Sequence, residues 1–209
     1  MIANDLDKEA IKKAKEAGCH SVFFAIESGD EYLRKKILNK PVSDDRIYQM
    51  GKWLHENDIK FGTYNMVGIP HETLIDAFKT VEMNVKIKTD YPHCSLVQPY
   101  PKTPLFDYCV NEGLLDPNFN PDDLTTMFDK SPIKLDDKEQ FENLQKLFYV
   151  ACKFPGTIPL IKKLIKKEHP MIYKLIMYFS FAHRNFNSFN AGMLNSILLG
   201  IKMRKLLFN

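Results

Sequence analysis

Residues 20–38 read HSVFFAIESGDEYLRKKIL, and this stretch decides the fold class. Its first part, His20–Ile26, is a nearly continuous apolar run rich in β-forming residues, which is typical of a strand covered on both faces. Residues 27–30 (ESGD) end the run, and a helical pattern then continues to Leu38. The stretch therefore predicts one strand followed directly by a helical segment.

The same alternation occurs twice more along the chain. Lys60–Gly68 (KFGTYNMVG) and Ser95–Gln98 (SLVQ) predict two further strands. Ser43, Thr73 and Thr103 each stand where a helix N-cap is expected, before a helical pattern. Because parallel neighbours need a crossover helix, this alternation predicts an α/β protein with three parallel strands in chain order and helices on the outer face only.

The second part of the chain has a different character. Residues 116–135 are rich in Pro, Asp and Asn, and the pattern beyond them is helical. Residues 1–152 carry 19 Lys and Arg against 25 Asp and Glu, whereas residues 153–209 carry ten against one. We therefore expect an α/β unit at 1–115 and a basic helical C-terminal extension at 116–209.

Composition and missing motifs exclude several classes of protein. A content of 44% hydrophobic and 26% charged residues is that of a globular chain and not of a disordered one. No apolar stretch reaches the roughly 18 residues needed to span a bilayer. The sequence has no GxSxG, Walker or GxGxxG motif, so hydrolase and nucleotide-triphosphatase functions have no support. We expect a cytoplasmic protein without a signal peptide.

The cysteines and histidines give no pattern for metal binding. Cys19, Cys94, Cys109 and Cys152 lie too far apart for CxxC or CxxxC spacing. The six histidines show no HxxxH spacing. The sequence therefore assigns no metal ligand and no catalytic residue within the chain.

The loops that follow the predicted strands are the candidate binding site. In parallel β/α proteins, ligands bind at the carboxyl ends of the strands. The Glu27 carboxylate could accept hydrogen bonds from ligand hydroxyls or an ammonium group, and a plain surface carboxylate is the alternative. Gly68 could equally be needed only for the geometry of its turn, and Tyr100 could be a packing residue.

Three segments in order carry a family resemblance. FFAIESGDEYLRKKILNK (23–40), NMVGIPHET (65–73) and PYPKTPLFDYCVNEGLL (99–115) resemble the second half of the radical SAM core, and most of all that of the cobalamin-binding radical SAM enzymes. The resemblance implies the last three βα units of a partial, TIM-like barrel, followed by an α-helical tail.

The resemblance also implies a chemistry. Radical SAM enzymes use S-adenosylmethionine (SAM) and a 4Fe-4S cluster, and the cobalamin-binding members perform methyl transfer or ring formation. A CxxxCxxC loop holds the cluster in that family, and this sequence contains no such motif. The chain is therefore expected to be a C-terminal part that is inactive alone and works with a missing N-terminal half or a separate chain.

The implied SAM site lies at the strand ends. Glu27 and Ser28 match the segment that contacts the ribose and methionyl end of SAM, and Glu72 matches a residue expected to order its loop. Tyr64 and Lys102 stand where the family has Gly. The cofactor-binding positions that the resemblance implies are Glu27, Ser28, Gly29, Met66, Gly68, Gln98, Pro99 and Tyr100.

Two other functions remain open at this point. One is a fragment of a protein similar to the RNA methylthiotransferases, which share these barrel motifs. The other is a non-catalytic, basic helical module on a remnant half-barrel. The lysine-rich extension could be simply solvated, or could contact a membrane surface or a small-molecule or lipid-like substrate. Nucleic acid is the least favoured partner, because no nucleic-acid-binding motif accompanies the charge.

Overall fold

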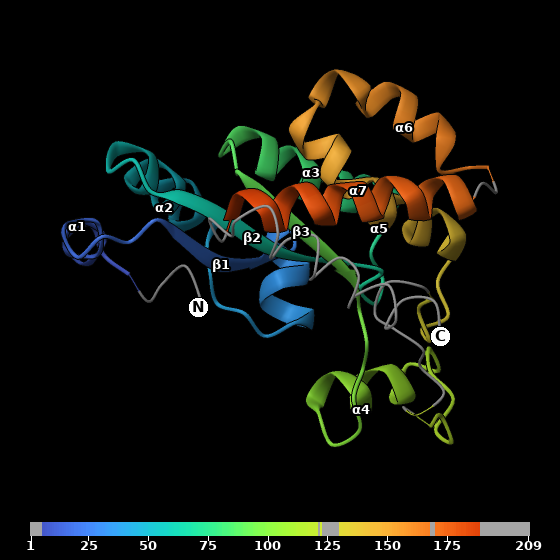
Figure 1. The fold of residues 1–209 in the computed structure, drawn as a ribbon. Coiled ribbons are helices and arrows are strands. Elements are labelled where there is room, and N and C mark those ends of the chain that lie inside the picture. The colour runs from blue at the N-terminus through green and yellow to red at the C-terminus, as the bar shows by residue number, and fades with distance from the viewer. Residues whose placement is uncertain (1–5, 121, 123–129, 168–169, 189–209) are drawn as a thin grey trace.

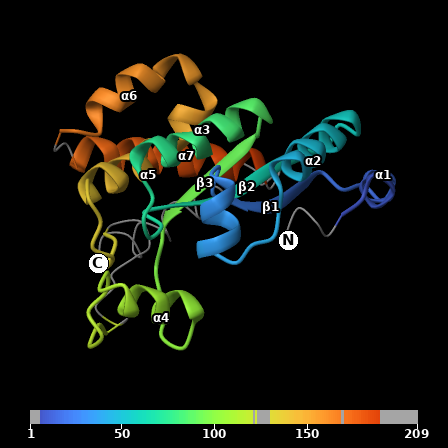
Figure 2. The ribbon, with the colours of Figure 1, turned by 180° about the vertical axis from the view of Figure 1, so that it is seen from behind.

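The structure, a computed structural model, describes residues 6–120, 122, 130–167 and 170–188. It contains a parallel sheet in the order β1-β2-β3, as the alternation predicts. Helices pack around the sheet, and α4 lies apart from them beyond the strand ends (Figures 1 and 2). The elements are α1 (Lys8–Glu16), β1 (Ser21–Glu27), the π-helix η2 (Leu33–Ile37), α2 (Asp44–Glu56), β2 (Lys60–Val67), α3 (Leu74–Lys86), β3 (Tyr91–Leu96), α4 (Pro104–Asn111), α5 (Lys138–Lys153), the 3₁₀ helix η4 (Pro155–Thr157), α6 (Ile158–Leu164) and α7 (Pro170–Ser188).

The predicted helix starts are confirmed by their capping bonds. The side-chain oxygens of Ser43, Thr73 and Thr103 each accept a backbone N–H at the start of α2, α3 and α4. Thr73 and Asp76 form a reciprocal capping box. These local bonds fix where each crossover helix begins, and therefore how long each strand-to-helix loop is.

The third strand begins four residues earlier than predicted, at Tyr91 instead of Ser95, and it ends at Leu96. Pro92 lies within it, opposite Thr63 of β2. Among the described strands β3 forms the edge of the sheet, and a proline is tolerated there because its missing N–H can face the free side. Of the run SLVQ, only Ser95 and Leu96 lie in the strand, and Val97 and Gln98 follow it.

The outer face of the sheet carries the core. Phe24 of β1 packs in one cluster with residues of α1 and α2, among them Ile47. Val67 and Leu96, from β2 and β3, pack in a second cluster with α3, α5, α6 and α7, which includes Phe148. The helices that follow residue 137 thus share a hydrophobic core with the strands.

The long C-terminal helices cover the edge of β3. Gln145 of α5 donates a hydrogen bond from Nε2 to the backbone oxygen of Cys94, 3.0 Å away. The expectation that helices cover only the outer face is wrong at α7, because its Phe181 ring lies 5.6 Å from the ring of His93. His93 pairs with Tyr64 in the sheet register, so the two side chains share the inner face.

Candidate functional site

Parallel pairing brings the carboxyl ends of the three strands to one edge of the sheet. Glu27 pairs with Asn65, and Met66 pairs with Ser95 in the next strand. The loops that follow these strands therefore meet at the same edge. Of the positions expected to bind SAM, the structure places Glu27, Met66, Gly68 and Gln98 at or directly beyond it.

Glu27 ends β1 in an unusual backbone conformation. The register between β1 and β2 shifts between Ala25 and Glu27, which marks a β-bulge, and Glu27 has a φ of 68°. Bulges of this kind re-aim a side chain at the end of a strand, and non-glycine residues at positive φ concentrate at functional sites. The Glu27 side chain is 16% exposed, and its nearest ion-pair partner, Lys40 Nζ, is 4.0 Å from Oε1. Burial raises its pKa above the ordinary value, and Lys40 partly offsets this.

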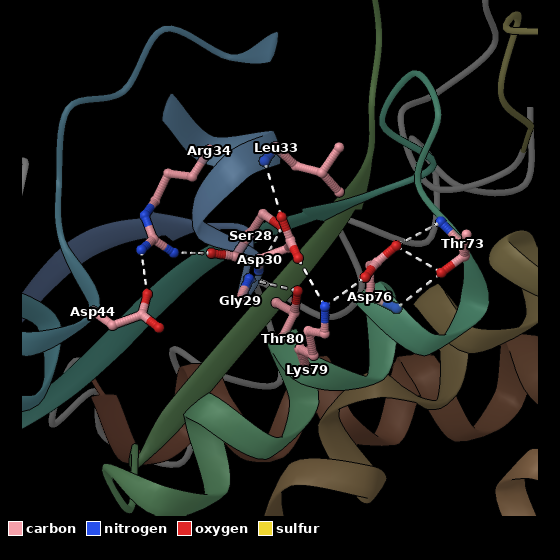
Figure 3. Close-up of polar contacts among 10 residues, drawn as sticks. All are labelled: Ser28, Gly29, Asp30, Leu33, Arg34, Asp44, Thr73, Asp76, Lys79 and Thr80. Atoms are coloured by element: carbon pink, nitrogen blue, oxygen red, sulfur yellow. Dashed lines mark hydrogen bonds and ion pairs between the residues drawn. The ribbon is translucent and has the colours of Figure 1, made fainter. Parts of the chain in front are cut away.

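Ser28 and Gly29 make contacts within the chain (Figure 3). Ser28 is fully buried, and its Oγ accepts a hydrogen bond from the N–H of Asp30 at 3.1 Å. The N–H of Gly29 donates to Thr80 Oγ1 of α3 at 2.7 Å. A Cβ on Gly29 would lie 2.4 Å from backbone atoms of Lys79 and Thr80. The glycine therefore permits close approach of α3, and these two residues serve the frame around Glu27.

A buried arginine holds the same turn from the other side. Arg34 has no exposed surface, and its guanidinium contacts the Ser28 backbone oxygen and the Asp44 carboxylate. Its Nε donates to the backbone oxygen of Val42 at 2.8 Å. A buried guanidinium needs all these acceptors, because an unpaired charge in the interior is costly. Arg34 thereby connects the turn after β1 to the loop before α2.

An ion pair closes the frame on its solvent side. Lys79 Nζ lies 2.8 Å from Asp30 Oδ2 and 2.7 Å from Asp76 Oδ1 (Figure 3). Partial burial opposes ionisation of Asp30, but the hydrogen bond from Lys79 holds the pKa of this carboxyl below its ordinary value. Asp30 also accepts the N–H of Leu33 at 3.0 Å, which orients the start of the following π-helix.

These framing residues carry little signal in the sequence. Arg34 lies inside the segment that carries the resemblance, and this position is the signal for its buried structural role. Thr80 and Lys79 carry no such signal. Thr80 lies 51 positions from its partner Gly29, and only the packing of α3 against the end of β1 brings them together.

The loop after β2 is ordered by a buried carboxylate, as expected for Glu72. Its Oε2 accepts the N–H groups of Gly68 at 2.6 Å and Ile69 at 3.1 Å. Gly68 has a φ of 77°, which suits a residue without a Cβ. Glu72 is 6% exposed, and its Oε1 is buried with no hydrogen-bond partner among the described residues. Burial raises the pKa of this carboxyl to about 8, although the two backbone donors act in the opposite direction.

The loop after β3 presents one orphaned polar atom. Gln98 Nε2 donates to the backbone oxygen of Lys130 at 3.1 Å. Its Oε1 is buried and has no hydrogen-bond partner within the described part of the chain. A buried acceptor without a donor is rare in folded proteins and calls for an explanation such as a bound group.

The rest of this loop turns through a lysine at positive φ. Lys102 has a φ of 67°, so it adopts the left-handed conformation that glycine favours. Thr103 Oγ1 donates to the backbone oxygen of Tyr100 at 2.6 Å. Pro99 is buried, whereas the Tyr100 side chain is 49% exposed.

Tyr64, at the other glycine position of the family, lies on the inner face of the sheet. Its ring centroid is 5.7 Å from that of Phe23 and 5.7 Å from that of His93. The side chain remains 45% exposed. The tyrosine therefore continues an aromatic row across the three strands, below the strand ends.

The residues present do not fit an iron–sulfur cluster. Throughout residues 6–120, 122, 130–167 and 170–188, no group of three or more His, Cys, Asp or Glu could hold a metal ion. Cys94, Cys109 and Cys152 are buried and free, and burial raises the pKa of Cys109 to about 11. At the strand ends, Glu27 and the orphaned Oε1 of Gln98 are acceptors for hydroxyl, ammonium or amino groups of a ligand.

Comparison with known proteins points to one superfamily. Residues 1–83 match the family model described as Radical SAM superfamily. The chain is also 27% identical over 176 residues to a protein of Pyrococcus horikoshii named as an uncharacterized methyltransferase. This similarity covers 82% of the chain and 36% of that relative, so the chain spans little more than a third of its length. Residues 1–83, from before α1 into α3, thus carry a match to the Radical SAM superfamily, on an α/β fold with a three-stranded parallel sheet.

Proposed function

We propose that this chain supplies the SAM-binding strand ends of a radical SAM methyltransferase. The observation that carries the proposal is the superfamily match over residues 1–83, which includes the strand end at Glu27 and the turn at Gly68. The name of the Pyrococcus horikoshii relative favours methyl transfer over the other reactions of the superfamily. The cluster ligands would come from outside the described residues, in another part of the protein or in a separate chain.

Within this proposal, Glu27 is the principal ligand-binding side chain. Its carboxylate would accept hydrogen bonds from the ribose hydroxyls or the ammonium group of SAM. Ser28 and Gly29 would position it through their bonds to Asp30 and Thr80. Their task is to hold the bulge at the end of β1.

The other two strand ends would bind the adenine. Gln98 Oε1 is the acceptor for its amino group, which would satisfy the orphaned atom. Met66, Gly68, Pro99 and Tyr100 would line the ring with side-chain and backbone atoms. SAM bound here would supply the methyl group or, at a reduced cluster, a 5′-deoxyadenosyl radical.

The finer proposal is that cobalamin carries the methyl group, as the family resemblance implies. The corrin would then be held by a part of the protein outside these residues. Titration of the chain with hydroxocobalamin tests whether it also contributes to that site. A saturable change in the visible spectrum supports a contribution, and its absence removes this chain from any corrin site.

Calorimetric or NMR titration of the 209-residue chain with SAM tests the main proposal. We expect saturable binding, with amide shifts confined to the three strand ends. Glu27→Ala should raise the dissociation constant about tenfold or more, since a charge-assisted hydrogen bond contributes about 1.5–3 kcal/mol. Glu31→Ala, at a partly exposed carboxylate four positions further along that forms an ion pair with Lys35, is the matched control.

Two results contradict the proposal. One is the absence of saturable binding at millimolar SAM by a chain whose thermal unfolding is cooperative. The other is an unchanged affinity in Glu27→Ala, with Glu27→Gln measured beside it to separate loss of charge from loss of the side chain. Binding with shifts in α5–α7 instead of the strand ends would favour the non-catalytic module.

A further inference from the structure

The outward face of α7 is apolar. Met171, Ile172, Leu175 and Phe179 are each between 53% and 78% exposed. At 100° per residue these four positions fall within an arc of about 100° on the helix. The opposite side of the same helix is buried in the core through Tyr173 and Met177. The helix is therefore apolar on both sides, although only one side has a partner within the described part of the chain.

The four side chains of this face are exposed and are not buried against the described sheet or helices. α7 lies on the near side of the molecule in Figure 1, and in the reverse view of Figure 2 it lies behind α3 and α5. Contiguous exposed apolar side chains are uncommon on soluble proteins and mark interaction surfaces. A single exposed leucine would need no explanation, but four large side chains in one row do.

Exposed lysines lie just before this helix along the chain. The hydroxyl of Tyr173 donates to the backbone oxygen of Leu164 at 2.8 Å, so the end of α6 packs against the start of α7. Lys163, Lys166 and Lys167 are exposed at this junction, and the buried side of α6 is formed by Ile161 and Ile165. Exposed lysines therefore come directly before the apolar row along the chain.

Basic residues dominate the last part of the chain. Between residues 153 and 209 the sequence has ten Lys and Arg, and Glu168 is its only acidic residue. No helix within the described ranges is both long and apolar enough to cross a bilayer. An apolar helix face, exposed lysines next to it along the chain and a length that does not span are features of a segment that lies in the membrane interface.

We propose that α7 docks on the surface of an anionic phospholipid bilayer, with Met171, Ile172, Leu175 and Phe179 inserted among the lipids and the lysines at the end of α6 and just after it on the headgroups. The charge decides between possible occupants. A second copy of this chain would bring the same lysines to the contact, and like charges would repel. An anionic bilayer attracts these lysines, and its lipids accept the apolar row without a surface shaped to match it.

Vesicle co-sedimentation of the full 209-residue chain tests this proposal. Vesicles of phosphatidylcholine with about 30% phosphatidylglycerol are compared with vesicles of phosphatidylcholine alone. We expect binding to the anionic vesicles, weakened at least about tenfold by omission of phosphatidylglycerol or by 0.5 M salt. The double variant Leu175→Ser/Phe179→Ser should lose at least about tenfold in partitioning, because both side chains leave the lipid.

Matched controls separate the surface from general effects. Ile75→Ser removes a 75% exposed apolar side chain from α3 and should leave vesicle binding unchanged. Lys166→Glu/Lys167→Glu should weaken binding, whereas Lys12→Glu/Lys36→Glu, with the same change in net charge, should weaken it far less. Thermal unfolding of each variant confirms that the fold is retained, since all these side chains are exposed.

Three results overturn the proposal. The first is no binding to anionic vesicles, and the second is equal binding to neutral ones. The third is a stable dimer in sedimentation equilibrium that the double variant Leu175→Ser/Phe179→Ser dissociates. The apolar face would then form the contact with a second copy. None of these results bears on SAM binding at the strand ends.

Discussion

The backbone N–H of Gly29 and the Oγ1 of Thr80 lie 2.7 Å apart, and their hydrogen bond ties the end of β1 to α3 (Figure 3). Both residues are buried. The bond lets α3 pack directly on the turn that follows Glu27, with no side chain between the two backbones. Glu27 is the side chain that we propose binds SAM. Its position thus depends on α3, the helix that follows the next strand.

Replacement of Thr80 by valine should expose the energetic role of this bond. Valine keeps the shape of the side chain but removes the acceptor, so the buried N–H of Gly29 is left unsatisfied. We expect a loss of about 1–3 kcal/mol in the free energy of unfolding, measured by urea denaturation. Thr80→Ser keeps a hydroxyl and should recover most of the loss. Equal stabilities for the valine and serine variants would contradict the role of the hydrogen bond.

Gly29→Ala should be more damaging than its size suggests. The added Cβ would lie 2.4 Å from the backbone of Lys79 and Thr80, and backbone atoms cannot move aside as a flexible side chain can. We expect a loss of about 3 kcal/mol or more, or failure to fold. Gly156→Ala is the matched control, because nothing lies within 4 Å of its added Cβ. A chain that accepts both substitutions equally would show that α3 does not pack on the turn as described.

Glu72 should make the stability of the protein depend on pH. Burial raises the pKa of this carboxyl from 4.5 to about 8 in the folded state. Between these values the folded state retains a proton that the unfolded state has lost. The free energy of unfolding should therefore fall as pH rises through this window and level off above about pH 8.

Glu72→Gln provides the test of that pH dependence. The glutamine oxygen can still accept the N–H groups of Gly68 and Ile69, but the side chain does not titrate. Urea unfolding at pH 5, 6.5 and 8.5 should show a smaller decline for Glu72→Gln than for the parent chain. Glu16→Gln, on the exposed surface of α1, should decline as the parent does. Parallel profiles for the parent and Glu72→Gln would rule out the buried proton.

The chain alone should not cleave SAM after anaerobic iron–sulfur reconstitution. A SAM-cleaving 4Fe-4S cluster needs three thiolates close together, with SAM on the fourth iron. The four cysteines are widely spaced in the sequence, and Cys94, Cys109 and Cys152 are buried. We expect no stoichiometric cluster by absorption and electron paramagnetic resonance, and no 5′-deoxyadenosine by chromatography. A stoichiometric cluster together with 5′-deoxyadenosine from the isolated chain would show that its own residues can hold the cluster.

The sequence by itself determined the order of the elements and the edge at which the site lies. Apolar runs of strand length predict β1 and β2, and the caps Ser43, Thr73 and Thr103 fix the helices between and after the strands, because these signals act over a few neighbouring residues. The role of Glu72 was also predictable, since its partners Gly68 and Ile69 lie within four positions of it.

Tertiary structure alone decided how the site is held. The positive φ of Glu27 arises from a bulge between two strands, and no local pattern marks a glutamate for that conformation. Pairing also extended β3 back to Tyr91, since an edge strand can include a proline. The bond between Gly29 and Thr80 and the exposed row on α7 depend on which surfaces meet in the folded chain. Contacts between residues distant in sequence are fixed only when the helices pack, and sequence periodicity cannot assign a partner to each face.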